Sequence, residues 1–315
     1  MIKYYLTEND QLHEVDAPQN GCWVSMVAPD EDEVAGTASR YGINPDAIRA
    51  ALDLDERSHI DADDGYTMVL VNIPTIEEDQ SEKELYSTIP MSILIVQDAI
   101  ITVCSEMSPI FNTFISGKVK DFHTQMKSRF ILQFLFRVDS LYMQYLRSID
   151  KKSDMVEDKL HKSTQNHELI ELLKLEKSLV YFTTALRSNE GVLEKLLRTD
   201  LIKKYPEDAE LLEDVIVENK QAIEMANIYS GILSGMMDAF ASVISNNLNI
   251  VMKVLAIITI VMAIPNMIFS AYGMNVNVKG MPFSASPWAF LIIIGISVCL
   301  SVLVALVFKK IKAFK

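Results

Sequence analysis

Acidic side chains are missing from the C-terminal part of this 315-residue chain. All six charged residues after Asn249 are lysines, so the part before residue 250 holds 42 acidic and 29 − 6 = 23 basic residues, a formal charge of −19. An acidic part of this size would repel nucleic-acid phosphates, which excludes nucleic acid as a partner. It suits a protein that meets cations, although many acidic cytosolic proteins have no such role.

The chain also lacks the motifs of common enzymes. It has no P-loop and no His-Glu-x-x-His, Gly-x-Ser-x-Gly or Cys-x-x-Cys sequence, and its five histidines show no ligand spacing. The three cysteines, Cys22, Cys104 and Cys299, are too scattered for a disulfide framework or a zinc site. No apolar signal core follows Met1, so export of the N-terminal part is not expected. We therefore predict a non-enzymatic protein with its N-terminal part in a reducing cytosol.

Two long apolar runs lie near the C-terminus. No charged residue occurs from Val254 to Tyr272, which gives roughly 28 Å of helix, close to the thickness of a bilayer core. A second run extends from Trp288 to Phe308. We predict transmembrane spans at about 250–272 and 288–308 rather than buried core helices. The lysine-rich tail after the second span predicts cytosolic N- and C-termini in a multi-pass protein of the cell membrane.

The first run carries a stripe of small and polar residues. At about 100° per residue, six of them share roughly a third of the helix circumference: Asn249, Ala256, Thr259, Ala263, Asn266 and Ser270. Such a stripe indicates either close helix packing or the lining of a watery path. An amide needs partners that lipid cannot supply, so Asn266 favours the path.

The front of the chain predicts an α+β domain with a mixed sheet and helices, over residues 1–107. Helices are expected at about 30–40 and 45–54 because acids and a proline open them. The charged stretch from Glu77 to Glu84 is interpreted as a connection between strands. The β-prone runs predict strands at 2–7, 22–27, 58–63, 66–73, 87–96 and 99–104.

The sequence after residue 107 predicts long helices. Helical periodicity dominates 127–162 and 167–200, within a helix and stalk region expected at 108–249, ahead of a pore region at 250–315. Pro206 followed by acids opens a helix that nothing interrupts before Tyr272, about 100 Å in length. A stalk of this length needs neighbours to bury its apolar face, which favours an oligomer.

The first span ends in Tyr272, Gly273, Met274 and Asn275, ahead of a short loop and the second span. With Trp23, the stretch from Tyr41 to Pro45 and the stretch from Asp55 to Asp61 upstream, this arrangement resembles the CorA-type divalent-cation transporters. The resemblance covers most of the chain. It implies a funnel-shaped homopentamer and assigns Tyr272 to Asn275 to a selectivity filter.

The resemblance also implies that Asn249, Leu255, Ala263 and Asn266 face the pore. Together with the rest of the stripe and Met252, the expected pore lining is Asn249, Met252, Leu255, Ala256, Thr259, Ala263, Asn266 and Ser270. The chain departs from the family in two places here. Ala263 aligns with a bulky gate residue, and Pro265 comes one residue later than usual. In addition, the loop from Val276 to Pro287 has no carboxylate, so any capture of cations outside the membrane is expected to be weak.

Our first hypothesis from these features is a channel-transporter that carries Mg²⁺ into the cell and is driven by the membrane potential. A transporter of zinc or cobalt with the same fold, with or without proton coupling, is the alternative, and a membrane-anchored sensor that conducts nothing is a third. The resemblance further implies regulation by cytosolic divalent ions. The residues expected to bind them are Asp214, Glu77, Glu78 and Asp79.

Overall fold

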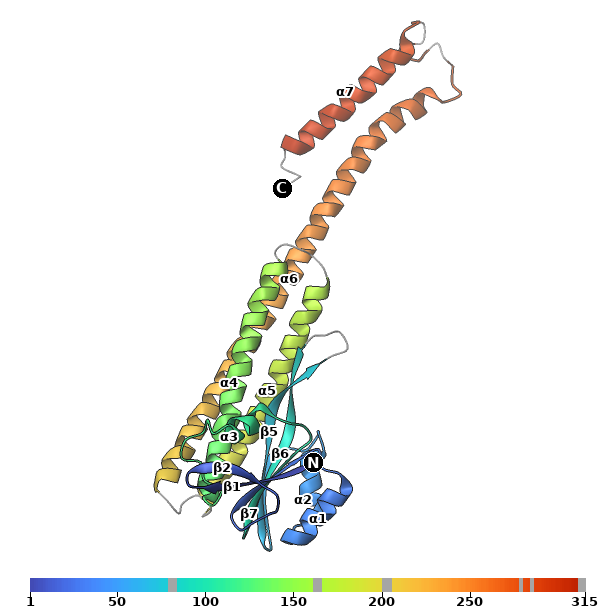
Figure 1. Cartoon of the computed structure of the whole chain (residues 1–315). Helices are drawn as coiled ribbons and strands as arrows, with labels where there is room; N and C mark the ends of the chain where they lie inside the picture. The colour runs from blue at the N-terminus through green and yellow to red at the C-terminus, as the bar shows by residue number, and fades with distance from the viewer. Residues whose placement is uncertain (79–83, 161–165, 200–205, 278–279, 284–285, 311–315) are drawn as a thin grey trace. The chain divides into compact units, whose positions relative to one another are not determined.

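A computed structural model describes residues 1–78, 84–160, 166–199, 206–277, 280–283 and 286–310 (Figure 1). The chain divides into two compact parts, the N-terminal unit Met1–Met237 and the C-terminal unit Asp238–Lys315. The division falls inside one long helix, α6 (Pro206–Tyr272).

The N-terminal unit is built on a seven-stranded mixed sheet with strand order β2-β1-β3-β7-β6-β5-β4. Only the pairing of β3 with β7 is parallel, and the other neighbours are antiparallel. This confirms the expected mixed sheet. The strands are β1 (Ile2–Glu8), β2 (Gln11–Val15), β3 (Cys22–Val27), β4 (His59–Asp63), β5 (Tyr66–Glu78), β6 (Glu84–Val96) and β7 (Ala99–Cys104).

The strand predictions were wrong in two respects. Strand β2 was not predicted, because it is an edge strand whose side chains are mostly exposed and show no apolar pattern. Strands β5 and β6 are longer than expected and continue to Glu78 and from Glu84, through residues interpreted as a charged connection. Their backbones pair in register from Tyr66 opposite Val96 to Glu78 opposite Glu84, so backbone hydrogen bonding extends the ribbon where no apolar pattern indicates it.

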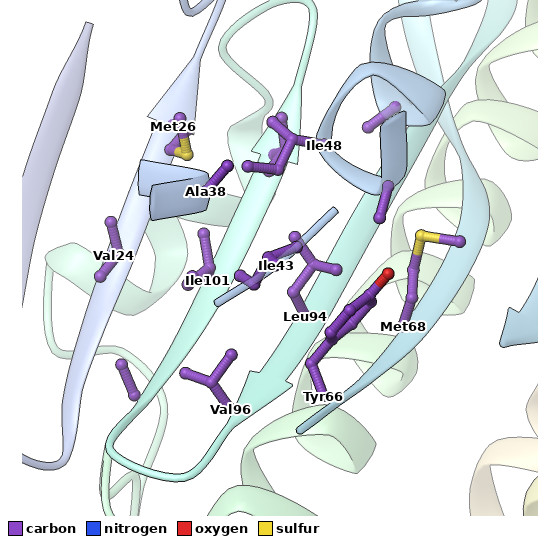
Figure 2. Packing of buried hydrophobic residues seen from close by; sticks show 14 of the residues in the cluster. Val24, Met26, Ala38, Ile43, Ile48, Tyr66, Met68, Leu94, Val96 and Ile101 are labelled. Carbon is purple, nitrogen blue, oxygen red and sulfur yellow. The ribbon is translucent and has the colours of Figure 1, made fainter. Parts of the chain in front are cut away.

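One face of the sheet is covered by two short helices, α1 (Glu31–Tyr41) and α2 (Pro45–Arg49) (Figure 2). Asp30 and Glu33 form a reciprocal capping box that starts α1, and Gly42 ends it in the left-handed conformation at φ 67°. The helix predicted at 45–54 stops at Arg49 and continues as a 3₁₀ turn, η1 (Ala50–Leu52). Figure 2 shows the core between these helices and the sheet, with Leu94 and Ile101 side by side on neighbouring strands and Ile48 contributed by α2.

The other face of the sheet packs against α3 (Pro109–Ile115), α4 (Lys127–Leu160) and α5 (Asn166–Arg198). Helix α3 was not predicted, and Ser108 caps it by accepting from the amide of Ile110. The centre of this layer is Trp23, which has no exposed surface. Its indole Nε1–H donates to Thr102 Oγ1 at 2.8 Å. Six aromatic rings surround it: Tyr5, Phe111, Phe114, Phe122, Phe130 and Phe134.

The long helices confirm the sequence-based expectation closely. The structure describes α4 as far as Leu160, α5 ends at Arg198, two residues before the expected end, and α6 has the predicted bounds. Within the N-terminal unit, α6 buries one side at alternating spacings of three and four residues: Leu212, Val215, Asn219, Ala222 and Ala226. This is the spacing of a coiled-coil seam, which explains how α6 packs there. The last helix, α7 (Ala289–Lys310), corresponds to the second apolar run.

Candidate functional site

The C-terminal unit contains two helices that are long and apolar enough to cross a membrane, the end of α6 and all of α7. Only 6% of the most hydrophobic window of each is buried inside the chain. The core helix of a soluble protein would be mostly buried, so these runs need an apolar environment from outside the chain. Their exposure agrees with the transmembrane interpretation of both.

All eight residues expected to face a pore lie on α6 and are exposed in the single chain. The hydroxyl of Thr259 has a hydrogen-bond partner within the helix, because it donates to the carbonyl of Leu255 at 2.8 Å. Among the residues that the structure describes, the amides of Asn249 and Asn266 have no hydrogen-bond partner. An amide without a partner costs several kcal/mol in hydrocarbon, so these two need water, an ion or another chain.

The end of α6 carries the expected filter residues. The amide of Gly273 donates to the carbonyl oxygens of Phe269 and Ser270 at 2.9 and 3.2 Å, which completes the last turn. The hydroxyl of Tyr272 donates to the carbonyl of Pro282 at 3.0 Å and attaches the following loop to the helix. Asn275 is exposed, and its side chain has no hydrogen-bond partner within the described ranges. A free amide at a helix end is available to a passing ion and its water.

Gly273 directly follows Tyr272, the last residue of α6. Its backbone is outside the left-handed region, unlike that of Gly42 or Gly117. A Cβ atom added there would lie 3.4 Å from the carbonyl oxygen of Phe269, an ordinary contact. The single chain therefore gives no steric reason for a glycine at this position.

The four acids expected to bind regulatory ions are only partly described. Asp214 is exposed on α6, and Glu77 is exposed near the end of β5. The side chain of Glu78 and the whole of Asp79 lie outside the described residues. No group of three or more His, Cys, Asp or Glu side chains among the described residues is placed to hold a metal ion.

Glu77 lines a groove of about 1090 Å³ between the β5–β6 ribbon, the segment after η1 and α5. Asp55, Glu56, Arg57 and Glu106 also line this groove, whereas Asp214 does not. Glu106 accepts a hydrogen bond from the hydroxyl of Thr75 at its edge. Sequence reasoning missed Glu106, because it is a single acid after the last strand and nothing in its neighbours marks it.

Two polar contacts join α4 to α6 inside the N-terminal unit, and sequence reasoning missed both. Asn219 Nδ2 donates to Asp139 Oδ1 at 2.9 Å in a buried position. Asp150 and Tyr229 form the second contact, where burial and the nearby Asp154 raise the pKa of the Asp150 carboxyl. A lone acid on the apolar face of a predicted helix, as at Asp139, is the signal that could have located the first.

Comparisons with known proteins decide the family. Residues 18–310 match the family model described as CorA-like Mg²⁺ transporter protein. The chain belongs to this family. It is 26% identical over 292 residues to the cobalt/magnesium transport protein CorA of Methanocaldococcus jannaschii, covering 91% of this chain and 90% of that protein. It is 22% identical over 300 residues to the Thermotoga maritima protein of the same name, covering 91% and 82%.

The fold of this CorA-family chain is also found in a solved structure. The complete structure of the CorA magnesium transporter from Methanocaldococcus jannaschii superposes with a TM-score of 0.82 at 23% identity, covering 98% of this chain and 97% of that one. The common fold is a mixed-sheet domain, a long helix and two apolar C-terminal helices. The resemblance based on Tyr272 to Asn275 and the upstream motifs is thereby confirmed.

Proposed function

We propose that several copies of this chain form a membrane pore that carries Mg²⁺ into the cytoplasm. The observation that carries the proposal is the set of unpartnered amides, Asn249, Asn266 and Asn275, on or just after a helix of membrane-spanning length. Mg²⁺ gives up its water reluctantly and prefers oxygen ligands. Amide oxygens can accept hydrogen bonds from the water around the ion without removing it. Two relatives named cobalt/magnesium transport proteins support the choice of ion.

Two apolar side chains lie between polar positions of the proposed pathway. Met252 and Leu255 are 58% and 57% exposed in the single chain, and they lie on α6 between Asn249 and Thr259. Rings of such side chains would exclude water when they close together, and a hydrated ion could not pass. We assign the gate to these two positions and the outer selectivity filter to Tyr272, Gly273, Met274 and Asn275.

The membrane potential supplies the driving force. Each elementary charge gains about 2.3 kcal/mol per 100 mV, so a dication gains about 4.6 kcal/mol on moving inward. No nucleotide-binding loop is therefore required. The positive-inside rule places Lys309 and Lys310, at the end of α7, on the cytoplasmic side, together with the large N-terminal unit.

The assembly we propose is a homopentamer with five α6 helices around the pore. One α6 helix cannot enclose a path, and the stripe amides of Asn249 and Asn266 have no hydrogen-bond partner in the described part of the chain. Exposed apolar residues farther down the helix, such as Val217, Ile228 and Ile232, offer further contact area for neighbouring copies. The number five follows from the family resemblance.

Cytosolic divalent ions would regulate the pore by joining neighbouring copies. Asp214 and Glu77 are exposed, and facing carboxylates on two copies would repel each other until a bound dication attracts both. Glu78 and Asp79 remain candidates for the same role. When the cytosolic Mg²⁺ concentration falls, the ions leave and the closed state loses its cross-links.

A second candidate function is transport of zinc or cobalt, with or without proton coupling. The observation that favours it is the loop from Val276 to Pro287, which has no carboxylate to attract Mg²⁺. The third candidate is a sensor that conducts no ion.

Ion flux into proteoliposomes separates these candidates. We expect uptake of Mg²⁺ by the wild type, loss of uptake in Asn275→Ala with unchanged assembly, and normal uptake in Asn247→Ala. The last variant is a matched control, because Asn247 is an exposed amide on α6 about 160° around the helix from Asn249. Uptake of Zn²⁺ without Mg²⁺ would favour the second function, and absence of any flux would favour the sensor.

A further inference from the structure

A carboxylic acid is buried where α4 packs against α6. Asp139 is only 2% exposed and lies on the apolar side of α4, one helical turn from Leu135 and Tyr142, which are also buried. Its Oδ1 accepts the one hydrogen bond from the amide of Asn219, at 2.9 Å. Among the described residues, the other titratable groups that act on it are Glu218 on α6 and Tyr142 on α4, and neither is positively charged at neutral pH. A carboxylate here would have no counter-ion.

The partner is also in an unusual position. Asn219 is fully buried and occupies a core position of the α6 seam, between Val215 and Ala222. Its side-chain oxygen Oδ1 is buried without any hydrogen-bond donor. An orphan acceptor of this kind costs about 1–3 kcal/mol. The site therefore lacks one donor as long as Asp139 is ionised.

One proton on Asp139 would remove both defects. A protonated carboxyl has one acceptor oxygen and one O–H donor, the same pattern as a primary amide. The amide of Asn219 is planar, so its oxygen lies beside the nitrogen that already contacts Asp139. The two groups can then form a closed pair, with Nδ2–H donating to Oδ1 of Asp139 and the Asp139 O–H donating to Oδ1 of Asn219.

We propose that Asp139 carries a proton at neutral pH and that its pair with Asn219 is a pH-sensitive lock between α4 and α6. When the proton leaves, a charge appears in an apolar seam, the orphan oxygen returns, and α6 loses the polar contact that fixes its register. A single polar residue at a core position of a helical seam is a known means of setting register. This proposal concerns the N-terminal unit alone and does not depend on ion transport.

The electrostatic surroundings agree with the geometry. Burial raises the pKa of the Asp139 carboxyl, the hydrogen bond from Asn219 lowers it, and Glu218 raises it again, to a pKa of about 8. Glu218 lines a groove together with Arg147 and Lys151. The folded state thus holds a proton that an unfolded chain would release near the ordinary value of 3.8.

The raised pKa of Asp139 makes the stability of the N-terminal unit depend on pH. Between about pH 4 and pH 8 the folded state binds one more proton than the unfolded state, so stability is greatest at the acidic end and falls as the pH rises. Above about pH 8 both states are ionised and the dependence ends. In this window the unfolding equilibrium constant rises by up to about tenfold per pH unit because of this group alone.

The test uses the full-length protein in detergent and two variants. Asp139→Asn has the shape and hydrogen-bonding pattern of the protonated acid but cannot ionise, and Asp238→Asn removes an exposed charge as a control. Urea unfolding of the N-terminal unit from pH 5 to pH 8 should show a steeper loss of stability in the wild type and in Asp238→Asn than in Asp139→Asn. Hydrogen exchange of the α6 segment 212–226, corrected for the intrinsic pH dependence, should increase near pH 8 only where Asp139 is retained.

Infrared spectroscopy gives a direct measurement of the proton. The wild type should show the carbonyl band of a protonated carboxylic acid at pH 6, and this band should fade near pH 8 and be absent from Asp139→Asn. Absence of the band at pH 6, or an unchanged pH dependence of stability in Asp139→Asn, would overturn the proposal. Unfolding of Asp139→Asn at every pH would also overturn it, because an amide that mimics the protonated acid should preserve the pair.

Discussion

Replacing Asn266 by leucine distinguishes a pore-facing stripe from a lipid-facing one. Asn266 lies six residues before the end of α6, about 9 Å along the helix axis and well inside the span. Its amide is exposed and has no partner in the described part of the chain. The two interpretations predict opposite effects, because leucine is favourable toward lipid but offers nothing to a hydrated ion.

The magnitudes can be estimated for both cases. If the amide faces lipid, leucine removes a polar group that costs several kcal/mol there and adds about 0.5 kcal/mol of favourable insertion. If the amide faces the path, each copy loses a hydrogen bond worth about 1 kcal/mol to the water around the ion. Even if only two of the five copies contact the hydration shell at once, two such losses raise the barrier by about 2 kcal/mol, which slows flux about thirtyfold.

The assay is initial Mg²⁺ uptake into proteoliposomes at a fixed potential, normalised to correctly assembled protein. Val261→Leu is the matched control, since it adds similar bulk about 140° around the helix. We expect Asn266→Leu to slow uptake at least about thirtyfold, Asn266→Gln to retain part of the flux, and Val261→Leu to match the wild type. Wild-type uptake by Asn266→Leu, with higher thermal stability, would refute the pore-facing assignment of this stripe.

Three further predictions concern regulation, assembly and the core. Asp214→Lys places a fixed cation where a bound dication is proposed, so it should change the Mg²⁺ dependence of flux and of protease protection; wild-type behaviour in both would remove Asp214 from the sensor. Native mass spectrometry in mild detergent should give a homopentamer, and a monomer at high protein concentration would contradict the pore. Trp23→Ala should lower the free energy of unfolding of the N-terminal unit by about 3–5 kcal/mol in urea titrations, because it leaves a cavity at the centre of a closed aromatic cluster. A loss below about 1 kcal/mol would mean that the surrounding rings move in and fill this cavity.

The sequence was most informative where local chemistry and apolar pattern agree. The start of α1 follows from Asp30 and Glu33 and its end from Gly42, and the bounds of α6 follow from Pro206 at one end and the Tyr272–Gly273 boundary at the other. It was least informative where backbone pairing alone makes the structure. Strand β2 has mostly exposed side chains, and the outer ends of β5 and β6 run into the charged stretch from Glu77 to Glu84, so no regular apolar alternation separates them from loops.

The candidate site likewise has residues whose positions the sequence predicts and residues whose positions it does not. The filter and the polar stripe lie within one continuous helix and its end, so their positions follow from sequence spacing. The contact between Asp139 and Asn219 joins residues 80 positions apart, and sequence spacing gives no sign that they meet. The regulatory acids remain a prediction, because a site shared between copies depends on how the copies pack.

The distribution of charge limits how the proposed pore can select its ion. All 42 acidic residues precede residue 250, and the loop between the spans has none. A carboxylate ring at the outer mouth would concentrate every cation nearby, and this chain has no acid with which to form one. Discrimination must then depend on neutral oxygens, those of Asn275 and of the backbone around Gly273, which distinguish ions by the size and strength of their hydration shells. Under the proposed function, attraction by charge acts mainly on the cytosolic side, where the acidic residues are available for regulation.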